Sequence, residues 1–98
     1  MTPSYARRRD DNHAELADAL RRLGWDVRDT SNCPSEPGIA DLSCTRRGRH
    51  AWVECKTEEG MLSQKQKDFR DRVVAAGDEY VVLRGIDDVV AWSEGAAP

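Results

Sequence analysis

Residues 38–56 decide the fold, and they read GIADLSCTRRGRHAWVECK. Two segments of this stretch, residues 39–45 and 50–56, carry small apolar side chains at every second position, which is the pattern of a β-strand. Residues 46–49, Arg-Arg-Gly-Arg, lie between the two segments and supply a tight turn. The stretch therefore predicts an antiparallel hairpin.

The register of this hairpin brings two acidic residues together. If residues 47 and 48 form a two-residue turn, Arg46 pairs with Arg49, and counting outward along both strands places Asp41 opposite Glu54. Directly opposed side chains share one face, with Cβ atoms about 4.5–5.5 Å apart. Two carboxylates so placed repel each other unless a divalent cation lies between them. A three-residue loop would shift the pairing by one residue, so the prediction depends on the turn length.

Lys56 lies two residues beyond Glu54 and therefore on the same face of its strand. Carboxylate oxygens beside an ammonium group suit Mg²⁺ or Mn²⁺ and an anionic substrate. Such a metal lowers the pKa of a bound water, and Lys56 can orient or deprotonate that water or support charge in the transition state. A solvated strand face that carries Glu-x-Lys by chance is the alternative. The opposed acids, the apolar reverse faces and the basic turn together favour the metal site.

The rest of the chain predicts helices and strands on either side of the hairpin. Before the hairpin we expect a flexible basic arm over residues 1–10, a helix from Asp11 or Asn12 to Gly24, a strand at residues 25–27 and a loop over 29–38. After the hairpin we expect a helix from the N-cap Ser63 to Gly77, a strand at residues 80–83 and a last helix capped by Asp87. This order predicts one α/β domain over residues 1–98, with a mixed central sheet flanked by helices.

Composition narrows the class of protein. The chain has 98 residues, a net charge of -3 and 39% hydrophobic residues, with no apolar run near the ~20 residues that span a bilayer. The N-terminal residues lack the apolar stretch of a secretory signal, so we expect a cytoplasmic protein. The odd cysteine count and the lack of a CxxC pair favour buried, reduced thiols over a disulfide framework or a zinc site.

These residues resemble the PD-(D/E)XK nuclease superfamily, and within it the VRR-NUC branch and small phage Holliday-junction-resolvase-like members. The resemblance is carried by residues 38–41 (GIAD), 54–56 (ECK) and 62–66 (LSQKQ), and it extends from about residue 10 to residue 92. It implies a restriction-endonuclease-like α-β-β-β-α-β core. Ala40 stands where the superfamily usually has proline, a position that shapes the strand entry and supplies no ligand.

The resemblance also implies an activity. We expect a Mg²⁺-dependent endonuclease, with Mn²⁺ as a substitute, that leaves 5′-phosphate ends on branched or structured DNA and acts as a homodimer in a phage-infected or prokaryotic host cell. A non-catalytic nucleic-acid-binding or interaction module that keeps the fold is the alternative. The implied metal ligands are Glu15, Asp41, Glu54 and the backbone carbonyl of Cys55, and the implied catalytic residues are Asp41, Glu54, Lys56 and Gln66.

Two of these residues have a competing structural role. If Asn12 is an N-cap, Glu15 completes a capping box, and Gln66 does the same if Ser63 is the N-cap. Capping and a role in the site can coexist.

Basic and aromatic side chains near the site have two interpretations each. The candidates for nucleic-acid contacts are Arg46, Arg47, Arg49 and Lys65, because local basic patches hold phosphates even in an acidic protein, although such clusters are often solvated surface. Trp52 shares the face of Glu54 and can stack on a base or pack under the first helix.

Overall fold

The elements follow one another in the predicted order. The computed structural model describes the backbone of residues 4–95 and the side chains of residues 12–95. The elements are α1 (Ser4–Arg22), β1 (Asp26–Asp29), β2 (Leu42–Arg46), β3 (Arg49–Cys55), α2 (Gln64–Ala75), β4 (Glu79–Leu83) and α3 (Ile86–Ser93). Over the described range, no helix combines the length and apolar character needed to cross a bilayer. The α-β-β-β-α-β core predicted from the sequence is confirmed, and α3 follows it.

The central hairpin has the predicted register. Its pairs run outward from Arg46 and Arg49 at the turn to Leu42 and Val53. The two turn residues, at positions 47 and 48, have φ angles of 53° and 80°. Positive φ at both positions is the signature of a type I′ turn, whose twist matches that of the flanking strands. The two-residue turn assumed in the sequence analysis is therefore correct.

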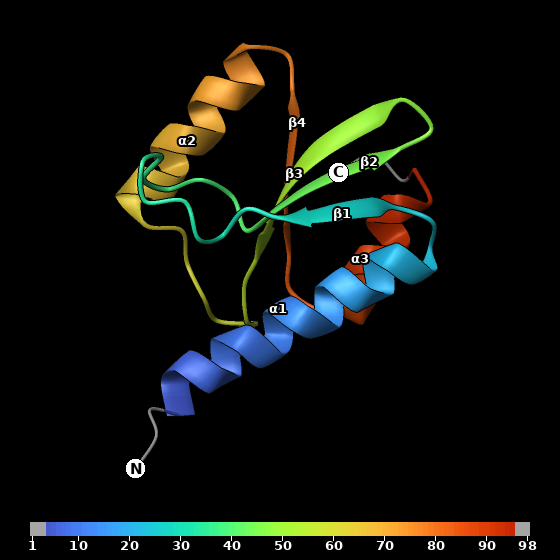
Figure 1. Ribbon diagram of the computed structural model, residues 1–98, viewed down its shortest axis with the longest axis horizontal. Helices are drawn as coiled ribbons and strands as arrows, with labels where there is room; N and C mark the ends of the chain where they lie inside the picture. The colour runs from blue at the N-terminus through green and yellow to red at the C-terminus, as the bar shows by residue number, and fades with distance from the viewer. Residues whose placement is uncertain (1–3, 96–98) are drawn as a thin grey trace.

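The sheet is mixed and carries helices on both faces. β1 pairs antiparallel with β2, β2 antiparallel with β3, and β3 parallel with β4, with α2 as the crossover between the last two. α1 and α3 lie on one side of the sheet and α2 on the other (Figure 1). Because successive strand residues point to opposite faces, β3 presents Ala51 and Val53 to the α1/α3 face, and Trp52 and Glu54 to the α2 face.

The main core lies between the sheet and the two helices of the α1/α3 face. Burying a leucine or valine side chain contributes roughly 1.5–3 kcal/mol, so this layer supplies much of the stability of a small domain. The largest side chains that it buries completely are Leu16, Leu20, Leu42, Val53, Leu83 and Val89.

Two of the three cysteines are buried as predicted, and the third is not. Cys44 and Cys55 are free thiols within the core cluster, and Cys33 is a partly exposed free thiol in the loop before β2. Burial raises the pKa of Cys44 to about 12 and raises the pKa of Cys55 as well, so both thiols stay protonated at neutral pH.

α1 begins earlier than predicted. We expected it near Asp11 or Asn12, but the backbone is helical from Ser4. Alanine and arginine favour helix, and nothing between residues 4 and 11 interrupts one. Residues 4–10 of the predicted arm are thus helical, whereas Met1–Pro3 and the side chains of Arg7–Arg9 lie outside the described part. Asn12 is about two turns inside the helix and is not its N-cap.

The predicted cap residue is correct for α2 and wrong for α3. α2 is preceded by the N-cap Ser63, as predicted, and Gly77 with a φ of 101° follows it. α3 is preceded by Gly85, which has extended backbone and no capping side chain, so the prediction that Asp87 caps this helix is wrong. Asp88 accepts a hydrogen bond of 2.9 Å from the backbone N–H of Arg84 and fixes the entry to α3 instead.

Candidate active site

Two carboxyl groups meet on the α2 face, at the end of the hairpin away from its turn. Asp41 lies one residue before β2, and its Oδ2 accepts a hydrogen bond of 2.9 Å from the backbone N–H of Cys55. Its carbonyl accepts another, of 2.8 Å, from the N–H of Thr30. The Asp41 carboxylate also lies close enough to Glu54 to raise the pKa of the Glu54 carboxyl group. The two acids therefore converge as predicted, although Asp41 lies outside the ladder of paired residues.

Glu54 is a buried acid, and one of its two carboxylate oxygens lacks a hydrogen-bond partner among the described residues. Its exposed fraction is 2%, and Oε1 has no donor among the described residues. Burial, and then the Asp41 carboxylate, raise the pKa of Glu54 to about 8, while the Lys56 ammonium opposes them. The neighbouring carboxylate and the burial therefore favour a state in which one of the two carboxyl groups holds a proton. Once both are ionised, Oε1 is a buried negative charge that needs a cation.

Lys56 supplies the positive charge beside these acids. Its Nζ lies 3.9 Å from Glu54 Oε2, and its side chain keeps an exposed fraction of 19%. Its backbone is fixed on two sides, because its N–H donates to Leu83 at 3.1 Å and its carbonyl accepts from the Asn12 side chain at 2.8 Å. The ammonium group is thus held near the carboxylates and still reaches solvent.

Gln66 performs both roles that the sequence left open. Its Oε1 accepts from the backbone N–H of Ser63 at 2.8 Å, and Ser63 Oγ accepts from the N–H of Gln66, which completes the predicted capping box. Its Nε2 donates to Glu54 Oε2 at 3.0 Å. The first turn of α2 therefore fixes the orientation of the Glu54 carboxylate.

A close backbone contact holds the loop before Asp41 against α2. Gly38 has a φ of 81°, and a Cβ at this position would lie 2.2 Å from the carbonyl oxygen of Lys65. An ion pair between Glu36 and Arg72 ties the same loop to α2 further along. Only glycine permits both this conformation and this approach. The contact brings the loop that carries Asp41 to the helix that carries Gln66.

Glu15 stands apart from the converging acids. It is an exposed residue of α1, and no hydrogen bond or ion pair of its side chain is found within the described range. Over that same range, no group of three or more His, Cys, Asp or Glu side chains is gathered closely enough to hold a metal. The alternative role is also wrong, because Asn12 is not an N-cap and Glu15 cannot complete its capping box.

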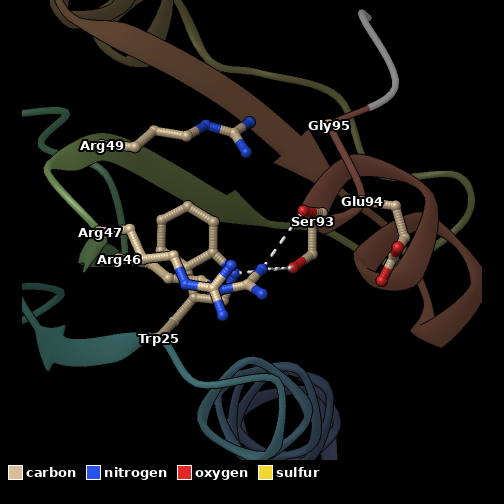
Figure 2. Close-up of a pocket in the computed structure, with 7 residues that line it drawn as sticks. All are labelled: Trp25, Arg46, Arg47, Arg49, Ser93, Glu94 and Gly95. Carbon is tan, nitrogen blue, oxygen red and sulfur yellow. Dashed lines mark hydrogen bonds between the residues drawn. The ribbon is translucent and has the colours of Figure 1, made fainter.

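The arginines of the hairpin turn lie far from the carboxyl groups. Arg46 and Arg49 project to the α1/α3 face at the other end of the hairpin, where they line a pocket beside Trp25 and Ser93 (Figure 2). Lys65, in contrast, is exposed in the first turn of α2, next to Gln66. The structure therefore separates the four basic residues, which were predicted as one set of nucleic-acid contacts.

Trp52 packs under α2 rather than under α1. Its ring meets Phe69 edge to face, with centroids 5.2 Å apart, and its Nε1 donates to Asp78 at 2.9 Å. The expectation of packing under the first helix is wrong, because α2 covers the face of the sheet that Trp52 shares with Glu54. Its contacts with Phe69 and Asp78 make Trp52 part of the support for this face.

Three residues near the site had no such role in the sequence analysis. Asn12 fixes the Lys56 carbonyl, and Arg84 donates to the carbonyls of Thr57 and Gly60, at 2.9 and 2.6 Å, in the loop after Lys56. Tyr80 has a buried hydroxyl with no partner among the described side chains, and burial, with Glu54 nearby, raises its pKa. Asn12 and Arg84 contact segments that are distant along the chain, so local sequence patterns do not predict their roles, and Tyr80 is marked only as a polar residue in an apolar strand.

A divalent cation fits the donors that the site presents. Asp41 and Glu54 offer hard carboxylate oxygens from two adjoining segments, and one buried oxygen of Glu54 has no donor within the described part of the chain. A cation bound there would take the place of the proton on Glu54 and neutralise both carboxylates. The two carboxylates alone do not form a complete ligand shell, so backbone oxygen and water would complete it.

Comparison with known proteins shows that this chain shares its fold with a solved structure. No protein-family model matches the chain, and no curated protein matches it. Among solved structures, a chain described as a VRR_NUC domain matches with a TM-score of 0.76 and 22% sequence identity. The match covers 91% of this chain and 97% of the other. The resemblance seen in the sequence is thereby confirmed at the level of fold: this chain has the fold of a VRR_NUC domain.

Proposed function

We propose that the protein is a metal-dependent nuclease that hydrolyses phosphodiester bonds. The observation that carries the proposal is the convergence of Asp41 and Glu54, with the Lys56 ammonium 3.9 Å from Glu54, on the fold of a VRR_NUC domain. A strand pair selected only for stability would not bury an acid beside another acid. The arrangement is what a phosphodiesterase needs in order to hold a cation and an anionic substrate together.

Mg²⁺ is the proposed cofactor, and Mn²⁺ is expected to substitute for it. Asp41, Glu54 and the backbone carbonyl of Cys55 would hold the ion, and Glu15 of α1 is the further ligand that the resemblance implies. When bound, the ion would supply a water of lowered pKa and positive charge near the phosphate. Oxygen donors alone suit these hard cations, and the buried thiols nearby take no part.

The side chains around the acids have separable tasks. Gln66 holds Glu54 Oε2 in place, so the orientation of the carboxylate does not depend on the ion. Lys56 is free at its tip to orient a water or to balance the charge that grows on the phosphate. Asn12 holds the carbonyl of Lys56 and Arg84 holds the loop that follows it, so both are positioning residues.

The proposed substrate is DNA, branched or otherwise structured, cleaved endonucleolytically to leave 5′-phosphate ends. A domain of 98 residues has little surface with which to grip a long duplex by itself. A homodimer, in which two sites cut two strands, would provide the larger surface. Size-exclusion chromatography with light scattering, with and without a four-way junction, measures the proposed assembly separately from the cleavage.

The proposed activity is tested by cleavage of labelled substrates with Mg²⁺, Mn²⁺ or EDTA. A four-way junction, a flap, a plain duplex and their RNA counterparts form the substrate panel. We expect metal-dependent cleavage of at least one of them, lost in Asp41→Asn and in Lys56→Ala. Lys67→Ala is the matched control, because it removes an equal charge from an exposed position of α2.

The contrary outcome is equally clear. If no substrate is cut with either metal and the folded protein binds no Mn²⁺, the activity is excluded and the non-catalytic module remains. Cleavage that persists unchanged in both Asp41→Asn and Lys56→Ala would show a contaminating nuclease or a site elsewhere.

A further inference from the structure

A second charged site lies at the turn of the hairpin. It is a pocket of about 360 Å³ lined by Trp25, Arg46, Arg47, Arg49, Ser93, Glu94 and Gly95 (Figure 2). The pocket lies between the turn and the end of α3, on the α1/α3 face. Asp41 and Glu54 are at the other end of the hairpin and on the other face, so the pocket does not belong to the candidate active site.

The pocket is built on a rigid aromatic base. Trp25 stacks on Trp92, with ring centroids 4.7 Å apart, and the Trp25 Nε1 donates to Ser93 Oγ at 2.8 Å. The Arg49 guanidinium lies 4.6 Å from the Trp92 ring and donates twice to Glu79, at 3.0 and 2.8 Å. Arg49 therefore forms a fixed side of the pocket, and Glu79 neutralises its charge.

Arg46 and Arg47 leave positive charge without a matching carboxylate. Arg46 donates through Nη1 to the Oγ and carbonyl of Ser93, at 3.0 and 3.4 Å, and it lies 5.9 Å from the Trp25 ring. Neither Arg46 nor Arg47 forms an ion pair within the described residues. Figure 2 shows both guanidinium groups reaching into the pocket, while the Glu94 carboxylate turns away from them. Arg46 is held by Ser93 and Arg47 is exposed at the turn, so an anion in the pocket would be attracted by both positive charges.

We propose that this pocket binds a backbone phosphate of a nucleic-acid strand, as a grip separate from the candidate active site. Planar guanidinium groups bind phosphate oxygens in pairs, and Arg46 is already oriented by Ser93 and Trp25. The identity of the polymer rests on the proposed nuclease function, whereas the affinity for phosphate rests on the pocket alone.

The separation of the two sites sets the length of strand that can occupy both. Asp41 and Arg46 are five residues apart, which is roughly 16 Å along a strand. Duplex phosphates are spaced about 3.4 Å apart along the axis of each strand, so about five base pairs of a duplex span this distance. The pocket therefore holds the nucleic acid well away from the bond that would be cut.

The test is binding of a fluorescently labelled single-stranded oligonucleotide in EDTA, measured by anisotropy over a range of salt concentrations. The variants are Arg47→Ala, Arg47→Glu and Arg46→Lys, with Arg22→Ala as the matched control, because Arg22 is an exposed arginine on α1. Loss of one phosphate contact lowers the slope of log K against log salt concentration by about 0.7. At about 0.1 M salt, this corresponds to binding that is about fivefold weaker. We expect this loss in Arg47→Ala, a larger one in Arg47→Glu, and none in Arg22→Ala.

Two further arms locate the binding and identify the ligand. Amide NMR resonances of Gly48 and Gly95 should move during the titration, because these residues flank the pocket. Inorganic phosphate alone should displace the oligonucleotide only weakly, and removing the 5′-phosphate of the oligonucleotide should change nothing if a backbone phosphate is bound. Strong competition by inorganic phosphate would overturn the assignment to nucleic acid in favour of a free-phosphate site.

The outcomes separate this proposal from the nuclease proposal. If Arg47→Ala and Arg47→Glu bind the oligonucleotide as wild type does, and Gly48 and Gly95 do not move, the pocket proposal is overturned even if Mn²⁺ binds at Asp41. If the pocket binds the strand but no Mn²⁺ binds and nothing is cleaved, the pocket stands and the nuclease proposal fails.

Discussion

At the scale of single residues, Glu54 determines how the protein responds to pH. Its pKa is raised from about 4.5 to about 8, first by burial and second by Asp41. The folded state therefore binds more protons than the unfolded state between these values, and the free energy of unfolding falls as pH rises through that range. Urea denaturation in EDTA at several pH values should show this decline in wild type and lose most of it in Glu54→Gln. Equal pH dependence in both proteins would contradict the raised pKa.

Asp41 carries the other half of the pair, and its removal separates function from stability. Asn at this position can still accept the hydrogen bond from Cys55, but it removes the negative charge beside Glu54. We expect Asp41→Asn to leave the free energy of unfolding unchanged or higher at pH 8, as measured by urea denaturation. A protein that unfolds instead would show that Asp41 is structural.

Gln66 joins capping to the site, and two variants separate these roles. Ser63→Ala removes the N-cap without touching Glu54 and should cost about 0.5–2 kcal/mol with little effect on cleavage. Gln66→Glu keeps an oxygen for the Ser63 N–H but removes the donor to Glu54 and adds a third acid, so cleavage should fall far more than stability. Denaturation and cleavage rates measured together check both. Equal loss of activity in the two variants would assign Gln66 to capping alone.

At the scale of elements, the loop that carries Asp41 depends on one glycine contact with α2. Gly38→Ala combines a positive φ with a Cβ 2.2 Å from a backbone oxygen, whereas Gly48→Ala has a similar φ and nothing within 4 Å. The second variant should cost about 1–2 kcal/mol from conformation alone. The first should cost clearly more and weaken Mn²⁺ binding, because Asp41 moves with the loop. Similar losses of unfolding free energy in both would show that the contact with α2 contributes nothing.

Sequence patterns predicted the local features of these elements and not their neighbours. The turn at positions 47 and 48 fixes the hairpin register through two adjacent backbone conformations, so counting residues was enough to bring Asp41 to Glu54. The capping box of α2 is equally local. The start of α1 was mispredicted because nothing in residues 4–11 interrupts a helix, and an acceptable N-cap residue within a helix gives a false start.

Local sequence patterns could not predict contacts between segments that are distant along the chain. Trp52 faces α2 because the crossover helix covers that side of the sheet, which a single strand cannot reveal. Arg49, a predicted nucleic-acid contact, also pairs with Glu79 of β4 and packs on Trp92 of α3, which the sequence did not indicate. Asn12 was read as a cap and instead fixes the Lys56 carbonyl. Each depends on which elements pack together.

At the scale of the whole molecule, the sheet separates stability from the proposed chemistry. The α1/α3 face holds the apolar core, and the α2 face holds the buried acid with its partners. The hairpin links the two, with the carboxyl groups at one end and the arginine pocket at the other. The length of the hairpin therefore separates the arginine pocket from the carboxyl groups.

Calorimetric titration of Mn²⁺ into the metal-free protein at pH 8 decides whether Asp41 and Glu54 form a cation site. Wild type and the control Asp18→Asn, which removes an exposed acid from α1, should bind the ion, and Asp41→Asn should not, while all three proteins remain folded. If wild type binds no Mn²⁺, or if Asp41→Asn binds it equally well, the two acids do not hold a metal and the proposed chemistry is contradicted.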